Sequence, residues 1–206
     1  DTTVPVITLT GESAVTIEVG STYTDAGATA TDNYDGDITS SIVTVNPVDA
    51  TTVGTYTLTY NVTDANGNVA VEVTRTVNVV DTTVPVITLT GESTVTIEVG
   101  SIYTDAGATA TDLSGEISVI STGTVDTSVV GTYTVTYNAT DASGNEAAAV
   151  SRTVNVVDTT VPVITLTGEA TVTIEVGSSY TDAGATALDN YDGDITSSIV
   201  TVSPVD

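Results

Sequence analysis

Cysteine, lysine, histidine, phenylalanine, tryptophan and methionine are all absent from this sequence of 206 residues. Without cysteine the chain forms no disulfide. Without cysteine, histidine and lysine it offers no serine or cysteine triad, no Schiff base and no nitrogen or sulfur ligand for zinc. Carboxylate pairs remain, but the nine tyrosines fall on core positions and leave no platform for a sugar substrate. The composition therefore predicts that the protein is not an enzyme.

Positive charge is also scarce, because 27 Asp and Glu residues face two Arg residues and give a formal net charge of −25. Such a chain repels the phosphates of nucleic acids and anionic membrane surfaces. No apolar run reaches the length needed to cross a membrane, and no secretion signal opens the sequence, so we expect no membrane insertion and targeting signals that lie elsewhere. The acidic balance indicates cations as partners, or solubility in salty surroundings.

Three repeats organise the chain. The segment DTTVPVITLTGES begins at Asp1, returns at Asp81, and recurs at Asp158 with alanine as its last residue. A period of this length suits a small autonomous β domain better than a helical solenoid. We expect repeats at 1–80, 81–157 and 158–206. The third lacks any counterpart of the last strands and is expected to be incomplete, as the truncated part of a longer protein.

Apolar and polar residues alternate in short segments, which in the first repeat are VITLT, VTIEV, ATAT, ITSSIVTV, TYTLTYNVT and residues 69–79. A period of two is typical of half-buried strands, and β-branched residues favour them. In the clearest segment Tyr56, Leu58, Tyr60 and Val62 share one face and are predicted to be core. No segment shows a helical period, so the fold class is expected to be all-β.

The motifs PVITLTG, YTDAGATATD, DGDIT, VGTYTLTYNVTDANGN and TRTVNVV occur in this order in the first repeat. Together they resemble the bacterial immunoglobulin-like (Ig-like) modules of surface proteins and adhesins, which also occur in some insecticidal crystal proteins. The resemblance implies tandem Ig-like β-sandwich modules in an extended array. It also places Tyr56 and Tyr133 at a tyrosine corner, where the hydroxyl bonds a nearby backbone group.

Arg75 and Arg152 lie in phase with core valines, which turns each guanidinium toward a core edge. A buried cation needs a hydrogen-bonded carboxylate. We expect Asp25 and Asp105 to be these partners.

Acidic loops are the candidate metal sites. The cluster DNYDGD places several oxygens around a glycine, as in part of a calcium loop, and DANGN is expected at the same end of a sandwich as the first residue of the repeat. The alternative is that these are ordinary turn residues, which Asp, Asn and Gly dominate for their own reasons. The candidate calcium ligands are Asp1, Asp32, Asp35, Asp37, Asp64, Asn66 and Asn68 in the first repeat, Asp81, Asp112, Glu116, Asp141 and Asn145 in the second, and Asp158, Asp189, Asp192 and Asp194 in the third.

Asp81 directly follows the last residue of the first repeat, so a cation bound there is expected to fix the junction, with Glu12 near enough to contribute. The leading functional hypothesis is a spacer or stalk of an extracellular or cell-surface adhesin or fibre. Its partners are calcium ions, neighbouring repeats and copies of itself. The alternatives are a carbohydrate- or protein-binding module that uses the loop at 112–116, and a filament subunit whose incomplete third repeat accepts strands from another chain.

Overall fold

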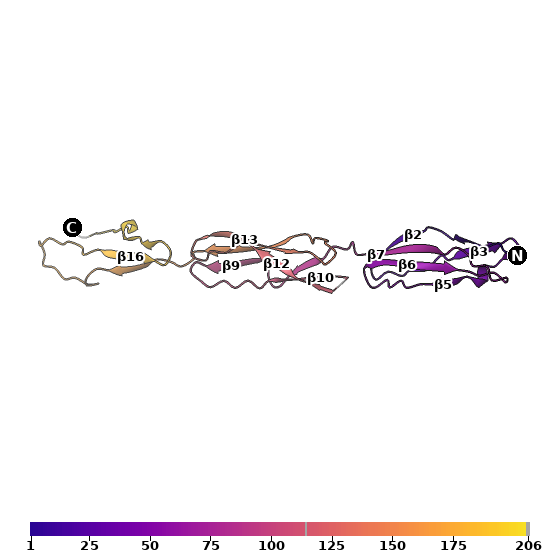
Figure 1. Ribbon diagram of the computed structural model, residues 1–206. Helices are drawn as coiled ribbons and strands as arrows, with labels where there is room; N and C mark the ends of the chain where they lie inside the picture. The colour runs from indigo at the N-terminus through magenta and orange to yellow at the C-terminus, as the bar shows by residue number, and fades with distance from the viewer. Residues whose placement is uncertain (114, 205–206) are drawn as a thin grey trace. The chain divides into compact units, whose positions relative to one another are not determined.

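The computed structural model describes residues 1–113 and 115–204. Within them the regular structure is β-strand, apart from two single-turn 3-10 helices, η1 (Thr39–Ser41) and η2 (Thr196–Ser198). Figure 1 shows the strands gathered along the chain in small sheets, which form tandem Ig-like modules as the sequence predicts. No helix among the described residues is long and apolar enough to cross a membrane.

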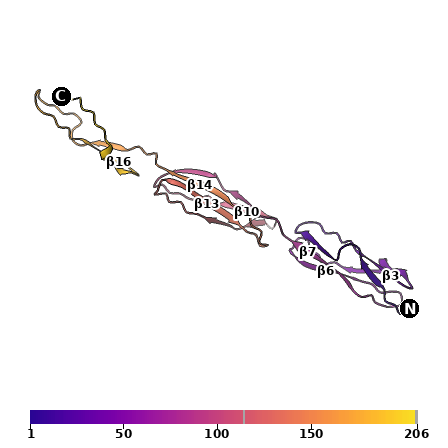
Figure 2. The same cartoon turned by 90° about the horizontal axis from the view of Figure 1, so that it is seen from above.

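The first repeat contains two sheets. One has the order β1-β3-β4 and the other the order β2-β7-β6-β5. Strand β2 pairs in parallel with β7, and the other pairs are antiparallel, with β6 and β7 side by side in both views (Figures 1 and 2). The strands are β1 (Val6–Leu9), β2 (Ala14–Glu18), β3 (Ala28–Asp32), β4 (Gly36–Asp37), β5 (Val43–Val45), β6 (Gly54–Asn61) and β7 (Val73–Val80).

The second repeat repeats this topology, with sheet orders β11-β10-β8 and β12-β13-β14-β9. Its β9 again pairs in parallel with β14. The third repeat contributes one sheet of order β15-β16-β17. The strands are β8 (Val86–Leu89), β9 (Thr94–Glu98), β10 (Ala108–Asp112), β11 (Gly115–Ile117), β12 (Val119–Thr122), β13 (Gly131–Ala139), β14 (Val150–Val157), β15 (Val163–Leu166), β16 (Ala185–Asp189) and β17 (Gly193–Asp194).

Residue contacts divide the chain into two compact units. One comprises Asp1–Ile87, Thr109–Val119 and Asn138–Ala148, and the other comprises Thr88–Ala108, Ile120–Tyr137 and Ala149–Asp206. This division runs through the second repeat. The repeat boundaries at 80 and 157 therefore stay a prediction of the sequence.

The core of the first repeat consists of apolar side chains from both of its sheets. Ile7 of β1 and Ala30 of β3 belong to the same buried cluster as Leu58 and Tyr60 of β6 and Val77 of β7. Because strand side chains alternate between faces, these residues occupy the alternate positions that the sequence pattern marks. Of the four predicted core residues, Leu58, Tyr60 and Val62 are confirmed as buried, whereas Tyr56 is half-buried.

Arg75 links the two sheets of the first repeat from a buried position, with a side chain that is 1% exposed. Its Nη1 donates to Asp25 and, at 3.1 Å, to the hydroxyl of Tyr60, which itself donates to Asp25 at 2.7 Å. Its Nε donates to the carbonyl oxygen of Glu12 at 2.9 Å, and Nη2 donates to that of Thr10 at 2.5 Å. A buried guanidinium is thus neutralised and hydrogen-bonded from several sides.

The second repeat builds the same network around Arg152. Its Nη1 donates to Asp105 and, at 2.8 Å, to the hydroxyl of Tyr137, over whose ring the guanidinium carbon lies at 5.6 Å. The predicted pairs of Arg75 with Asp25 and of Arg152 with Asp105 are confirmed.

Both predicted tyrosine corners are also confirmed. The hydroxyl of Tyr56 donates to the carbonyl oxygen of Thr52 at 2.9 Å, and that of Tyr133 donates to the carbonyl oxygen of Val129 at 2.8 Å. Each bond spans four residues and fixes the turn that leads into β6 or β13.

Two predicted strands differ from the structure. The segment ITSSIVTV is interrupted by η1, because Thr39 donates its N–H to Asp37 at 3.0 Å and accepts the N–H of Ala30 at 3.0 Å. Such local side-chain bonds compete with strand pairing. The last strand begins at Val73, and not at Val69. Val69 instead forms an isolated antiparallel bridge with Thr63 across the turn that follows β6.

Candidate metal centre

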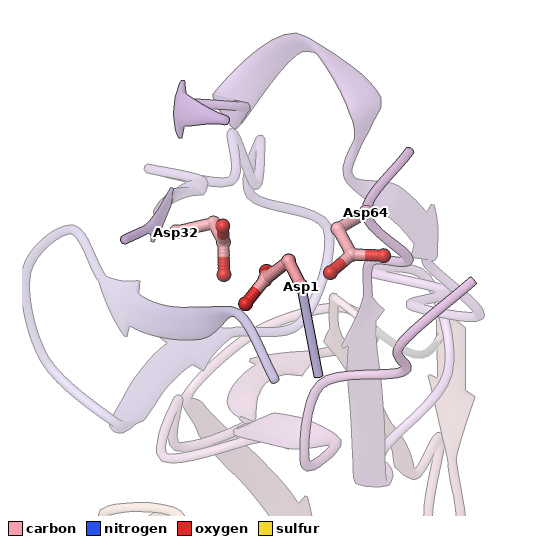
Figure 3. A group of neighbouring side chains, drawn as sticks. All are labelled: Asp1, Asp32 and Asp64. Atoms are coloured by element: carbon pink, nitrogen blue, oxygen red, sulfur yellow. The ribbon is translucent and has the colours of Figure 1, made fainter. Parts of the chain in front are cut away.

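Three aspartates from distant parts of the first repeat converge at one end of its sandwich. Asp1 precedes β1, Asp32 ends β3, and Asp64 follows β6. Because β1 and β3 pair antiparallel with Val6 opposite Thr31, the start of one lies beside the end of the other. One carboxylate oxygen of each aspartate lies within 4.8 Å of the others. Figure 3 shows the three side chains turned toward one another.

Asp64 is held by its own turn. Backbone N–H groups of Asn66 and Asn68 donate to its Oδ1 at 2.9 and 2.7 Å, and the side-chain nitrogen of Asn68 donates to its Oδ2 at 2.6 Å. The same nitrogen lies 3.4 Å from the carbonyl oxygen of Asp1 and ties the turn to the start of the chain. Gly67, with φ of +88°, supplies the left-handed conformation that closes this turn. Asn68 therefore presents its nitrogen to the cluster and acts as a support.

Asp32 leaves one oxygen without a partner. Its Oδ1 accepts the N–H groups of Tyr34 and Asp35 at 2.8 and 3.1 Å. Its Oδ2 is buried and has no hydrogen-bond partner among the described residues, in a side chain that is 8% exposed. A buried carboxylate oxygen without a donor is costly, and a cation in the cluster would satisfy it.

Asp35 and Asp37 lie outside this group of three. Oδ2 of Asp35 accepts the N–H of Ala65 at 3.0 Å, which joins the two acidic loops to each other. Oδ1 of Asp37 accepts the N–H of Thr39, the first residue of η1, at 3.0 Å. These two candidate ligands have roles in loop structure in this arrangement.

The second repeat forms a corresponding cluster from Asp81, Asp112 and Asp141. Asp81 and Asp141 are 9% and 8% exposed. The side-chain nitrogen of Asn145 donates to the carbonyl oxygen of Asp81 at 3.1 Å and to Oδ2 of Asp141 at 2.7 Å. Glu116, on β11, is exposed and does not belong to the group of three.

The third cluster has a different composition, because Asp158 and Asp189 are joined by Asp192. Oδ1 of Asp189 accepts the N–H groups of Tyr191 and Asp192 at 2.8 and 3.0 Å, as Asp32 does in the first repeat. Oδ1 of Asp194 accepts the N–H of Thr196, the first residue of η2, at 3.0 Å, as Asp37 does for Thr39 of η1.

Hydrogen bonds favour the charged form of one aspartate in the first cluster and of one in the second. Burial alone would raise the pKa of Asp64 and of Asp141, but the hydrogen bonds from Asn68 and Asn145 and from their turns outweigh it and lower both pKa values. In the third cluster burial and the charges of Asp189 and Glu98 raise the pKa of Asp158. A divalent cation would relieve this repulsion.

Three oxygens at this spacing fit a hard cation. Calcium binds six to eight oxygens at about 2.3–2.6 Å, so two ligands of one ion lie within roughly 5 Å of each other. Each cluster provides three carboxylates, and water or backbone oxygens would complete the shell. No nitrogen or sulfur ligand is available. The residues fit calcium or magnesium in preference to zinc.

The sequence analysis expects Glu12 near a cation at Asp81, but a different glutamate lies beside this linker. Glu12 contributes its backbone oxygen to Arg75, whereas Glu18 reaches the linker, with Oε1 accepting the N–H of Thr82 at 2.7 Å. The sequence does mark this glutamate, since the segment VTIEVG that contains it recurs in every repeat. Its position beside the linker becomes evident only from the structure. There β2 pairs in parallel with β7, and Glu18 lies opposite Val80, the last residue before the linker.

Comparisons with known proteins identify the module type. A family model described as bacterial surface protein, Ig-like domain, matches residues 7–79, 87–156 and 164–206. The chain is 36% identical over 176 residues to hyalin of Strongylocentrotus purpuratus, across 80% of this chain and 15% of that protein. It is 37% identical over 196 residues to hyalin of Lytechinus variegatus, across 87% of this chain and 36% of that protein. The chain thus spans a minor part of either relative.

Among solved structures, a lipoprotein from Bacteroides thetaiotaomicron is 24% identical, with a TM-score of 0.35, over 67% of this chain and 61% of its own. The family match extends over most of the sequence and includes a segment in every repeat. The chain belongs to the family of bacterial surface protein Ig-like domains.

Proposed function

We propose that the chain is a non-catalytic structural part of a longer extracellular surface protein, such as an adhesin, in which repeated Ig-like modules serve as a spacer and bind calcium. The family supports a cell-surface setting. Near-identical repeats also support a spacer, because reach requires copies of one module, whereas a ligand-binding role favours divergence of one copy's loops.

The observation that carries the calcium proposal is the recurrence of the three-aspartate cluster. Each cluster includes the first residue of a DTT segment, namely Asp1, Asp81 or Asp158. Asp81 and Asp158 directly follow Val80 and Val157, the last residues of β7 and β14. A cation there ties the residue that leaves one repeat to the loops of the next, and so restricts the linker.

The chemistry of the ligands supports a hard divalent cation over a soft one. All three clusters contain carboxylates alone, and the unpartnered oxygen of Asp32 gives the first cluster a buried acceptor. Calcium tolerates irregular coordination with six to eight ligands, whereas magnesium demands a near-ideal octahedron and holds its water tightly. Loops that provide three carboxylates are therefore better suited to calcium.

Thermal unfolding of the 206-residue chain tests the proposal, measured by calorimetry in chelator, in millimolar calcium and in millimolar magnesium. A ligand at about 100 times its Kd stabilises a folded state by about 2.7 kcal/mol. In a module of this size that corresponds to a rise in Tm of roughly 10–20 °C. We expect calcium to produce such a rise and magnesium a smaller one.

Asp141→Asn is the matched variant, since it removes one carboxylate from the second cluster and nearly preserves its shape. Glu146→Gln is its control, because it removes the same charge from an exposed neighbour outside the cluster. Asp141→Asn should reduce the calcium-dependent rise, and Glu146→Gln should leave it unchanged. A Tm that does not respond to calcium in the unmodified chain would refute calcium binding and leave the spacer role supported by repetition and family alone.

A further inference from the structure

In the first and second repeats, the glutamate that ends the parallel strand accepts hydrogen bonds from the linker that follows the repeat. Oε1 of Glu18 accepts the N–H of Thr82 at 2.7 Å and the hydroxyl of Thr83 at 3.1 Å. Its Oε2 accepts the hydroxyl of Thr82 at 2.9 Å. Both oxygens of one carboxylate are thus bound by two consecutive threonines.

The second repeat reproduces this contact at Glu98. Its Oε1 accepts the N–H and the hydroxyl of Thr160 at 3.1 and 2.8 Å, and its Oε2 accepts the hydroxyl of Thr159 at 2.7 Å. The N–H of Thr159 lies 3.0 and 3.2 Å from the two oxygens. The same residue types make the same contact in both repeats, so the contact belongs to the repeated sequence.

Strand pairing explains why the contact forms. Glu18 ends β2 and lies opposite Val80 in the parallel pairing with β7, and Glu98 lies opposite Val157 in the pairing of β9 with β14. Parallel strands point the same way, so the end of the shorter strand stands beside the exit of the longer one. The carboxylate therefore meets the two residues that follow the next aspartate.

The held threonines are the immediate neighbours of a cluster aspartate. The N–H of Thr83 donates to Oδ1 of Asp81 at 3.1 Å, and the N–H of Thr160 donates to Oδ1 of Asp158 at 3.3 Å. The same segment at the start of the chain has the N–H of Thr3 bonded to Asp1 at 3.0 Å. Asp1 is exposed, whereas Asp81 is 9% exposed.

We propose that Glu18 and Glu98 are positioning residues for the cation sites at Asp81 and Asp158, each fixing the linker so that its aspartate is already placed when the cation arrives. The inference rests on the calcium binding proposed above. An aspartate on a loose linker must be ordered by the binding event, and the cost of ordering weakens the apparent affinity. A carboxylate of one repeat thus sets the cation affinity of the next.

The charge of the glutamate acts in the same direction. Both oxygens of Glu98 lie within hydrogen-bond distance of the N–H of Thr159, the residue directly after Asp158, so its negative charge lies close to that cluster. A cation at Asp158 is attracted by this additional negative charge even though Glu98 is not part of the cluster. Placement and charge can be separated, because glutamine retains an acceptor oxygen but not the charge.

The test uses the 206-residue chain with Glu18→Ala, Glu18→Gln and, as the matched control, Glu175→Ala. Glu175 fills the same position in the third repeat, and its carboxylate has no hydrogen bond to any described residue. Amide hydrogen exchange of Thr82 and Thr83 is measured by NMR in chelator, which reports the contact in the absence of metal. Calcium titrations then follow the amides of Ser143 and Asn145 for the second cluster, and those of Asn66 and Asn68 for the first.

We expect Glu18→Ala to accelerate exchange at Thr82 and to weaken calcium binding at the second cluster by about tenfold, the cost of ordering about one residue. The first cluster should keep its calcium affinity in Glu18→Ala. The affinity of the second cluster in Glu18→Gln should lie between that of Glu18→Ala and that of the unmodified chain. Glu175→Ala should match the unmodified chain at both clusters. Unchanged exchange at Thr82, or faster exchange with unchanged calcium affinity, overturns the positioning role alone. If no amide of the unmodified chain responds to calcium, the proposed calcium binding fails and the positioning role with it.

Discussion

Replacing Asp25 by alanine should destabilise the first repeat by about 3–5 kcal/mol, because it leaves the guanidinium of Arg75 charged and buried without its carboxylate. Arg75 is 1% exposed and Asp25 is 17% exposed, so solvent cannot replace the lost partner at the guanidinium. A domain of this size is stable by roughly 4–12 kcal/mol. The loss therefore takes about a quarter of its stability or more, a fall in Tm of at least about 12 °C.

The second repeat is a control within the same molecule. Its network of Arg152, Asp105 and Tyr137 is not in contact with Asp25, so its stability should not change. Calorimetry of the 206-residue chain should accordingly show one transition moved to lower temperature and one unmoved. Combining Asp25→Leu with Arg75→Met removes both charges, and should recover much of the loss, since apolar residues of similar size can replace a buried pair.

The reasoning would be refuted by an Asp25→Ala chain whose transitions all stay within the equivalent of about 1 kcal/mol of the unmodified chain. A double variant no more stable than Asp25→Ala would show that the cost arises from packing and not from the unpaired charge.

Two further predictions concern hydrogen bonds outside the arginine networks. The hydrogen bonds that the linker donates lower the pKa of Glu98 to about 2, so the stability that its ionised form contributes is complete above the ordinary pKa of 4.5 and is lost as the pH falls from about 4.5 toward 2. NMR titration of the side-chain carboxyl carbon checks this, and a midpoint near 4.5 would contradict the contact. Tyr56→Phe removes the hydrogen bond to Thr52 and should cost about 1 kcal/mol in urea unfolding, whereas Tyr34→Phe, at a side chain that is 75% exposed, should cost nothing measurable.

Much of the fold follows from local residue chemistry. Alternation at a period of two predicts the buried face of β6, and the phase of Arg75 with the core valines predicts that a carboxylate must meet it. These predictions depend only on which side of a strand a residue faces. For the same reason they miss η1. There the side-chain hydroxyl of Thr39, and not a backbone carbonyl of a neighbouring strand, accepts the N–H of Ala30.

The candidate site was predicted only in part. Sequence spacing places Asp32 and Asp64 in turns, and the resemblance to a sandwich predicts that both turns lie at one end. Which members converge is decided by turn geometry, because Asp35 and Asp37 use their carboxylates to bond backbone N–H groups of the loops. The role of Glu18 depends on a parallel pairing that no local pattern encodes.

One segment that occurs in all three repeats separates what the local sequence determines from what tertiary packing determines. The segment VITL occurs as β1, β8 and β15, and its alternation alone determines that it is a strand in all three repeats. Ile7 and Ile87 are 8% and 9% exposed, yet Ile164 at the same position is 63% exposed. Burial requires a second sheet packed against the strand, and among the described residues the third repeat supplies one sheet. The sequence by itself determined which segments are strands, which residues share a strand face, and where the repeats recur. Only the tertiary structure decided what each strand face packs against and which aspartates come together, because both depend on residues far apart in the chain.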